Sequence, residues 1–182
     1  DGGVVANSDG IWVSSSGTAG SMLASNQQLV VSTSRTEDIA ASLGSTYMTN
    51  GSTPALYASF TFRCAGLPTS AGAYFAHFTG PNTFGSLTGH RARVWAGLTN
   101  FATGTQATPG SFMLSLLNTT NNPISGAQWP NELATNVTYT IVVKYEIATM
   151  VATMWIDPVS ESDPSITGTD FPSDLLDPAN GL

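Results

Sequence analysis

The stretch NVTYTIVVKYEIATMVATMWIDP, residues Asn136 to Pro158, decides the fold of this chain. Apolar residues alternate from Tyr139 through Ile141 to Ile147, and a second apolar run follows a short break near residues 148–150. Alternation with a period of two is typical of a strand with one buried face. The stretch predicts a long β-hairpin, whose turn lacks the Asn-Gly or Asp-Gly signal that would fix its type. Pro158 ends the second strand because it has no amide donor.

The same alternation recurs along the rest of the chain. In ALYASFTFRC, residues 55–64, the even positions from Leu56 to Phe62 form an apolar face, and the odd positions from Tyr57 to Arg63 form a more polar one. Similar runs, each bounded by Gly, Pro, Asn or Ser, are GIWVS, QQLVVST, AYFAHF, HRARVWAG, SFMLSLLN and VATMWID. Many short strands with almost no helix predict an all-β fold, a two-sheet antiparallel jelly-roll sandwich.

At most one helix is expected, and it would be short. In residues 36–43, Thr36 is a potential N-cap, and Glu37 and Asp38 would lie in the first turn. The segment ends before Gly44. This order favours about one and a half helical turns, because acidic groups are stabilised at a helix N-terminus and glycine favours its end.

Length and composition point to one domain in an extracellular setting. The chain has 182 residues, which suit a single β-sandwich domain over residues 1–182. Only 9% of the residues are charged, whereas 41% are hydrophobic, so hydroxyl and amide groups solvate most of the surface. Such a surface is common in secreted all-β proteins, and we expect an extracellular or cell-surface location.

Charge excludes two classes of partner. The formal net charge is −7, and the five basic residues (Arg35, Arg63, Arg91, Arg93 and Lys144) are scattered along the chain. Binding to nucleic acid or to an anionic membrane needs clustered basic groups, so neither partner is expected. The sequence also lacks an apolar run of about 18 residues, so no membrane span is expected.

Cys64 is the only cysteine. It cannot form a disulfide within the chain or contribute to a multi-cysteine zinc site. Its place at the end of an alternating strand predicts a buried, inert thiol.

The order of these segments resembles a known family. SRTEDIAASL, LYASFTF, LPTSAGAYFAHF, RARVWA, the long hairpin and SESDPS are similar to the successive blocks of a laminin G-like, concanavalin A-like jelly-roll domain found in large secreted or surface-anchored bacterial proteins. The resemblance runs from about Trp12 to Asp170. It implies the fold and an extracellular setting, whereas the same sandwich serves lectins, glycanases and structural modules, so it does not fix the activity.

Two departures from the family have structural consequences. The family has a glycine in the long hairpin turn, where this chain has IATMVATM, so an exposed Met150 or a wider turn is expected. The family also continues into another strand that closes one sheet. We therefore expect this chain to lack its final closing strand, leaving an open edge where a neighbouring chain could add a strand.

The best candidate for a ligand face is the segment AYFAHF beside HRARVWAG. Arg91, Arg93 and Trp95 alternate with small apolar residues, which would turn two guanidinium groups and an indole outward from a sheet. Sugars are bound by such mixtures of aromatic faces and planar donors. The alternative is that Trp95 belongs to the core and that the arginines pair with acids such as Glu132 or Glu146. A further aromatic candidate is Trp129, which could equally cap the core.

The acids of WIDPVSESDPS allow two interpretations. Asp157, Glu161 and Asp163 follow the hairpin and so should lie on a rim loop, where they could help hold a single structural calcium ion. Their spacing does not match the continuous Asp-x-Asp-x-Asp-Gly loop that wraps calcium. Asp and Ser near Pro also form turns by bonding their own backbone, which needs no ion.

Catalysis is the least supported activity. Glycanases of this fold carry alternating carboxylates along one strand. The only acid well inside a predicted strand is Glu146, which faces the same way as Lys144, so a surface ion pair between them is expected. No Gly-x-Ser-x-Gly motif is present, and the spacing of His77 and His90 is not that of zinc ligands.

These observations lead to three hypotheses. The first is a non-catalytic extracellular module that binds a polysaccharide or cell-surface glycan, or mediates adhesion. The second is a structural subunit of an extracellular fibre or surface layer that assembles through an open sheet edge. The third is a glycoside hydrolase or lyase.

Overall fold

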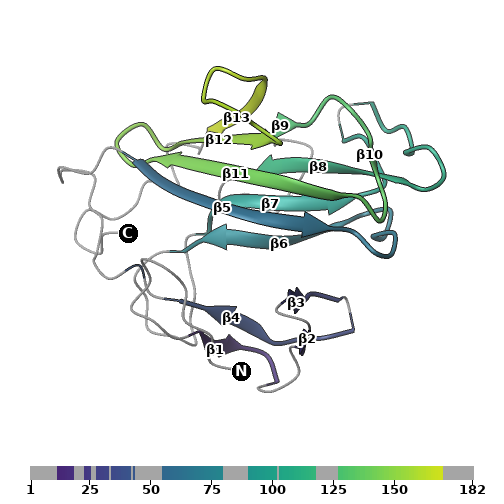
Figure 1. Ribbon diagram of the computed structural model, residues 1–182, viewed down its shortest axis with the longest axis horizontal. Helices are drawn as coiled ribbons and strands as arrows, with labels where there is room; N and C mark the ends of the chain where they lie inside the picture. The colour runs from purple at the N-terminus through teal and green to yellow at the C-terminus, as the bar shows by residue number, and fades with distance from the viewer. Residues whose placement is uncertain are drawn as a thin grey trace. The chain divides into compact units, whose positions relative to one another are not determined.

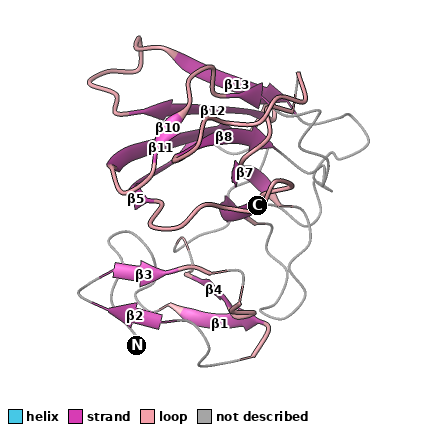
Figure 2. Ribbon diagram, turned by 90° about the vertical axis from the view of Figure 1, so that its right-hand side faces the viewer, coloured by secondary structure: helices cyan, strands magenta, loops and turns pink. Residues whose placement is uncertain are grey.

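The computed structural model describes residues 12–18, 23–25, 28–32, 34–41, 43, 55–79, 90–101, 103–117 and 127–169. The chain divides into two compact units, one formed by residues 1–48, 79–88 and 176–182, the other by residues 49–78 and 89–175. All regular elements in the described residues are strands (Figure 2). The expectation of one domain over residues 1–182 stays a prediction.

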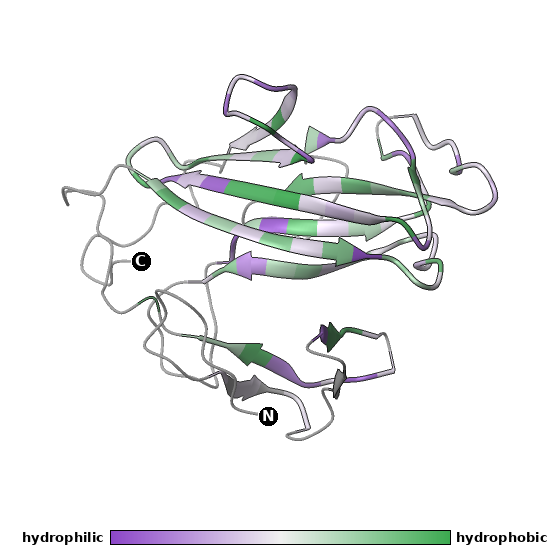
Figure 3. Cartoon of the chain, viewed as in Figure 1, coloured by the Kyte–Doolittle hydropathy of each residue, from purple (hydrophilic) through white to green (hydrophobic). Residues whose placement is uncertain are grey.

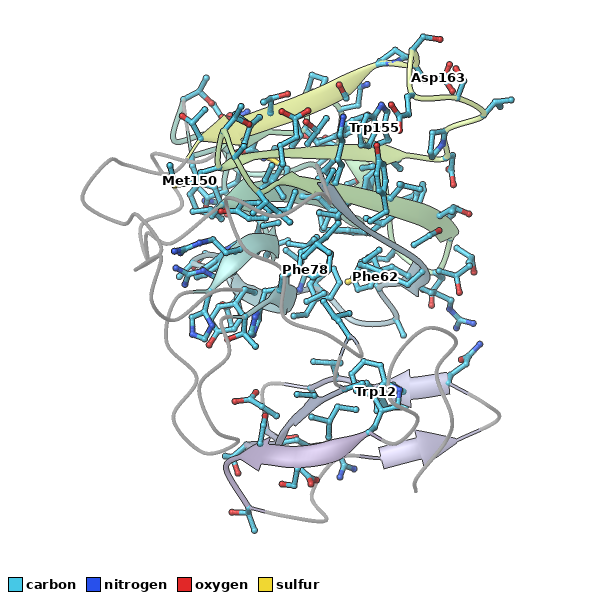
Figure 4. The ribbon with its side chains drawn as sticks, turned by 90° about the vertical axis from the view of Figure 1, so that its left-hand side faces the viewer. Trp12, Phe62, Phe78, Met150, Trp155 and Asp163 are labelled. Carbon is cyan, nitrogen blue, oxygen red and sulfur yellow. The ribbon has the colours of Figure 1, made fainter. Side chains whose placement is uncertain are left out.

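The first unit contains two small antiparallel ribbons. In one, β1 (Val13–Ser16) pairs with β4 (Asp38–Ala40), and in the other β2 (Leu23–Ser25) pairs with β3 (Gln28–Val30). Trp12, just before β1, is exposed (Figure 4).

The one short helix that the sequence allowed, over residues 36–43, does not form, because β4 occupies the middle of that segment. Thr36 does not cap a helix. Its Oγ1 accepts a hydrogen bond from the amide of Thr18 at 3.2 Å, next to β1. A helix of one and a half turns cannot repay the cost of its nucleation, whereas the ladder to β1 gives the same residues partners at once.

The second unit is a sandwich of two antiparallel sheets (Figure 1). One sheet has the order β13-β12-β11-β5, and the other has the order β10-β8-β7-β6, with β9 also paired to β8. The bounds are β5 (Ala55–Arg63), β6 (Ala73–Phe78), β7 (Arg91–Gly97), β8 (Ser111–Leu117), β9 (Ala127–Gln128), β10 (Leu133–Ala134), β11 (Thr138–Glu146), β12 (Val151–Ile156) and β13 (Ser165–Thr169).

The predicted hairpin is confirmed as β11 and β12. Their register runs unbroken from Ile141 opposite Ile156 to Glu146 opposite Val151. Met150 (labelled in Figure 4) closes the turn with a φ of 56°, the left-handed conformation that glycine adopts most readily. The second strand ends at Ile156, before Pro158, as predicted.

The core lies between the two sheets. On β11 the inward residues Ile141, Val143 and Tyr145 are at most 2% exposed, and β8 contributes Phe112, Leu114 and Leu116, each fully buried. The apolar segments of β11 and β8 are visible in Figure 3. Phe62 of β5 meets Phe112 of β8 at 5.9 Å between ring centroids, which joins the sheets through an edge-to-face contact.

The predicted all-β, antiparallel two-sheet fold is therefore confirmed. Consecutive strands β6, β7 and β8 form one meander and β11, β12 and β13 form another, while β5 joins β11 across a long connection. The jelly-roll connectivity and the family resemblance stay predictions. Within the residues described above, no helix is long and apolar enough to cross a bilayer.

Candidate functional site

The loop before β6, at Ala71 and Gly72, positions the indole of Trp95 on β7. Its indole Nε1 donates a hydrogen bond to the carbonyl of Ala71 at 3.2 Å. The approach is possible because residue 72 is glycine: a Cβ there would lie 2.3 Å from Trp95 Nε1 and 2.5 Å from the carbonyl oxygen of Ala96. Gly72 also has a φ of 70°, which disfavours any other residue. The loop before β6 therefore fixes the indole.

Tyr74 of β6 is the centre of a group of rings. Its ring centroid lies 5.5 Å from that of His77, 5.7 Å from that of His90 and 6.0 Å from that of Trp95. The two imidazole rings also touch each other, at 4.4 Å. The guanidinium carbon of Arg93 lies 5.4 Å from the Tyr74 ring centroid, within range of a cation–π interaction. We call these five residues the Tyr74 cluster.

The cluster lies on the outer face of its sheet. Trp95 is paired with Tyr74 on one side and with Ser115 on the other. Directly opposed residues of antiparallel strands share a face, and successive residues alternate. Since Leu114 and Leu116 point into the core, Ser115 and its partner Trp95 point away from it.

The arginines are on this strand as predicted, but their exposure was predicted wrongly. Arg91 and Arg93 are 2% and 1% exposed, so neither guanidinium group projects into solvent. Ala92 between them has a φ of 50°, and the pairing with β6 shifts register at this point. The bulge interrupts the simple alternation only at Arg91. Arg93 stays in register with Leu117 of β8, on the same face as Trp95, and is nevertheless buried there.

The acids proposed as partners of the arginines have other contacts. Glu132 Oε2 accepts a hydrogen bond from the amide of Thr108 at 3.0 Å. Glu146 forms an ion pair with Lys144, at 3.0 Å between Nζ and Oε1, which confirms the predicted surface pair. The hydrogen bond from Lys144 lowers the pKa of Glu146, and the same contact raises the pKa of Lys144.

Two polar groups beneath the cluster have no hydrogen-bond partner. Ser115 is 1% exposed and its Oγ is unpaired, and the Nε2 of Gln128, opposite Ser115 in the ladder, is likewise unpaired. The other end of that carboxamide is fixed, because Oε1 accepts a hydrogen bond from the amide of Phe101 at 2.9 Å. Among the described residues, this face thus buries two polar atoms without a partner near its aromatic rings.

The three acids of the rim loop accept hydrogen bonds from separate sets of partners. Asp157 Oδ1 accepts from the amide of Thr140 at 2.6 Å, and Glu161 accepts from the hydroxyl of Tyr57 at 2.5 Å. Asp163 accepts from the amides of Ser160 at 3.0 Å and Val159 at 2.6 Å, and these bonds lower its pKa. The hydrogen bond to Glu161 raises the pKa of Tyr57.

The rim loop also covers Trp155. The Nε1 of Trp155 donates to the carbonyl of Glu161 at 3.2 Å, and the indole is 4% exposed. Figure 4 shows Asp163 in the loop that follows this strand. The loop is therefore organised by its own acids and backbone, as one of the two interpretations predicted. Among the residues with described positions, no group of three or more His, Cys, Asp or Glu side chains could hold a metal ion.

Trp129 and Cys64 are both buried. Trp129 is 9% exposed and follows β9, where its amide bonds to the carbonyl of Leu114 at 2.9 Å. This placement favours a role in capping the core, so we leave Trp129 out of the ligand face. The thiol of Cys64 donates to the carbonyl of Gly66 at 2.9 Å, and burial raises its pKa, in agreement with the prediction of an inert thiol.

Sequence reasoning missed most of the partners of Trp95. AYFAHF and HRARVWAG suggested a ligand face, but the contacts of Tyr74 with both histidines depend on pairing between β6 and β7. Ser115 and Gln128 gave no sequence signal, since neither belongs to a binding motif. Comparison with protein-family models, with curated proteins and with solved structures found no match to this chain.

Proposed function

We propose that this chain is a non-catalytic glycan-binding module and that the Tyr74 cluster is its binding site. The observation that carries the proposal is the pairing of two partly exposed aromatic residues, Tyr74 and Trp95, on the outer face of one sheet. Sugar rings offer apolar faces that pack on aromatic rings, and hydroxyl groups that need directed donors and acceptors.

Polar groups suited to sugar hydroxyls surround the two rings. His77 and His90 are half-buried and touch Tyr74 from the same strand and from the residue before β7. An imidazole can donate or accept a hydrogen bond at neutral pH. The guanidinium carbon of Arg93 lies over the Tyr74 ring, 5.4 Å from its centroid, where its positive charge is attracted to the aromatic face.

The non-catalytic assignment is supported by how the acids are used. Glu146 is held by Lys144 and by the hydroxyl of Thr149 at 2.9 Å, and it lies on the other sheet from the Tyr74 cluster. Glycoside hydrolysis needs two carboxyl groups that flank the glycosidic bond. The Tyr74 cluster consists of aromatic and imidazole rings and one guanidinium group, and it contains no carboxyl group. The small share of charged residues, 9%, supports an extracellular or cell-surface location for this module.

The test is a polysaccharide array probed with the wild-type chain and with Tyr74→Ala. The matched control is Tyr57→Ala, because Tyr57 is an exposed tyrosine on the opposite sheet. We expect Tyr74→Ala to weaken binding at least about tenfold, the effect of one lost aromatic contact, and Tyr57→Ala to leave it unchanged. Circular dichroism would confirm that both variants fold. A wild-type chain that binds no glycan, or equal loss in both variants, would contradict the proposal.

A further inference from the structure

β5 is the edge strand of its sheet and has one unused side. It pairs with β11 along all nine residues, from Arg63 opposite Thr138 to Ala55 opposite Glu146. In the described part of the chain, no strand pairs with its other side. An unpaired edge presents a row of amide and carbonyl groups that can accept another strand.

The orientation of these groups follows from the ladder. The carbonyl of Thr140 accepts from the amide of Asp157, so Thr140 and alternate residues of β11 point their backbone groups toward β12. The residues between them, such as Ile141, therefore bond to β5, where Phe60 is the partner of Ile141. It follows that Tyr57, Ser59 and Thr61 direct their amides and carbonyls toward the open edge.

The other edges of the sandwich are interrupted, and β5 is not. The pairing of β6 shifts register twice, the edge beside β8 is split into the two-residue strands β9 and β10, and β13 has five residues with Gly168 inside. β5 has nine residues in continuous register, without Pro, Gly or Lys, and its only charge is Arg63 at the end. Interruptions of this kind block strand addition, so β5 is the edge suited to it.

The core beside β5 is incompletely covered. Phe60 and Phe62 point inward but are only half-buried, whereas Ile141 and Tyr145 on the adjacent strand are fully buried. Both rings contact Phe75 of the other sheet, with Phe62 stacked on it at 4.3 Å. A further strand with apolar inward residues would remove these rings from water.

We propose that β5 pairs with β5 of a second copy of this chain, antiparallel and about a two-fold axis at Ser59. In that register all nine residues overlap and each inward residue meets another inward residue, as Leu56 meets Phe62 and Ala58 meets Phe60. Arg63 then lies opposite Ala55, so the two positive charges are far apart. The second copy's Arg63 is diagonal to Tyr57, whose hydroxyl holds the negatively charged Glu161. The strand is thus complementary to itself in shape, polarity and charge.

This arrangement closes at a dimer. A two-fold interface uses the same surface on both copies and leaves no second β5 for a third. The interrupted edges do not continue the sheet, so the assembly is a dimer with one continuous eight-stranded sheet and not a fibre.

A proline at Thr61 tests the interface at the backbone. The backbone amide of Thr61 points to the open edge. Thr61→Pro therefore removes a donor at that edge and no hydrogen bond to β11. Sedimentation equilibrium between about 10 µM and 1 mM should show a dimer for the wild-type chain and for the control Thr61→Ala. The dissociation constant of Thr61→Pro should be at least about tenfold higher, at an unchanged circular dichroism spectrum.

A second variant tests the register through a side chain. Ser59→Lys places two like charges opposite each other at the two-fold axis and should raise the dissociation constant, whereas Ser59→Gln should not. A wild-type chain that stays monomeric over the whole range would overturn the proposal. A monomer that binds only a foreign extended peptide at β5, or a polymer larger than a dimer, would also overturn it. The same holds for a dimer whose dissociation constant changes in neither Thr61→Pro nor Ser59→Lys. Glycan binding is measured independently, so either proposal can fail alone.

Discussion

Met150 adopts a backbone conformation that costs free energy for any residue with a Cβ. Its φ of 56° places it in the left-handed region, in the four-residue turn between β11 and β12. Asn136 and Asp157 share this conformation, and asparagine and aspartate tolerate it better than methionine does. The turn is therefore accommodated by the strength of the hairpin and not by a favourable turn residue.

Replacing Met150 should show this cost directly. We expect Met150→Gly to be more stable than Met150→Ala by about 1 kcal/mol, because both remove the side chain but only glycine relieves the left-handed backbone. Urea denaturation of the two variants measures the difference in unfolding free energy. Equal midpoints and slopes would show that the turn relaxes at no cost.

For the acids of the rim loop, residue type alone does not determine whether a carboxylate binds a metal ion or the backbone. A carboxylate can bind calcium or accept backbone amides, and Asp163 accepts two amides in this loop. Proline and serine around it favoured a turn, which is the structure observed. The hydrogen bond between Glu161 and Tyr57 joins residues 104 positions apart, so local sequence could not predict it.

Among the elements, β6 and β7 form the site together with the loop that precedes them. The indole of Trp95 packs where a side chain at residue 72 would otherwise lie, so the strand and the loop depend on one glycine. The register shifts between β6 and β7 then bring Tyr74 and His77 to the same ring cluster. A bulge commonly redirects side chains in this way at functional sites.

Gly72→Ala should therefore damage both fold and binding. The added Cβ would meet the indole and a carbonyl in a left-handed backbone, and we expect a loss of at least about 2 kcal/mol in unfolding free energy together with weaker glycan binding. Gly66→Ala is the matched control, since no atom lies within 4 Å of its added Cβ, and it should stay within about 0.5 kcal/mol of the wild-type chain. Trp95 fluorescence and chemical denaturation would report the two effects. Similar stability of both variants would contradict the packing argument.

For the whole molecule, stability is expected to concentrate in the central strands of the second unit. β7 and β8 carry the most buried residues, and β11 buries its inward side chains. All three strands are paired on both sides. β2 and β3 form a two-stranded ribbon in which Gln28, Leu29 and Val30 are exposed. An isolated two-stranded ribbon is marginally stable in water.

Native-state hydrogen exchange should separate these regions. The amides of Ile141 and Val143 should exchange only through global unfolding, and the amides of β3 should exchange many times faster through local opening. Comparable protection in β3 and β11 would show that the two units unfold as one.

The sequence by itself determined the fold class, the β11–β12 hairpin, the Lys144–Glu146 pair and the buried thiol. Each depends on neighbouring positions, because alternation with a period of two sets which residues share a face. The same rule located Trp95 and Arg93 on one strand. The capping signals at residues 36–43 were misleading, because β4 in that segment pairs with the distant strand β1.

Only the tertiary structure decided which residues meet. The ring contacts of Tyr74, the burial of Arg91 and Arg93, the unpaired Ser115 and the open side of β5 all depend on which strands are neighbours and where their register shifts. Pairing between strands far apart in the chain is set by the packing of the whole core, so no local pattern encodes it.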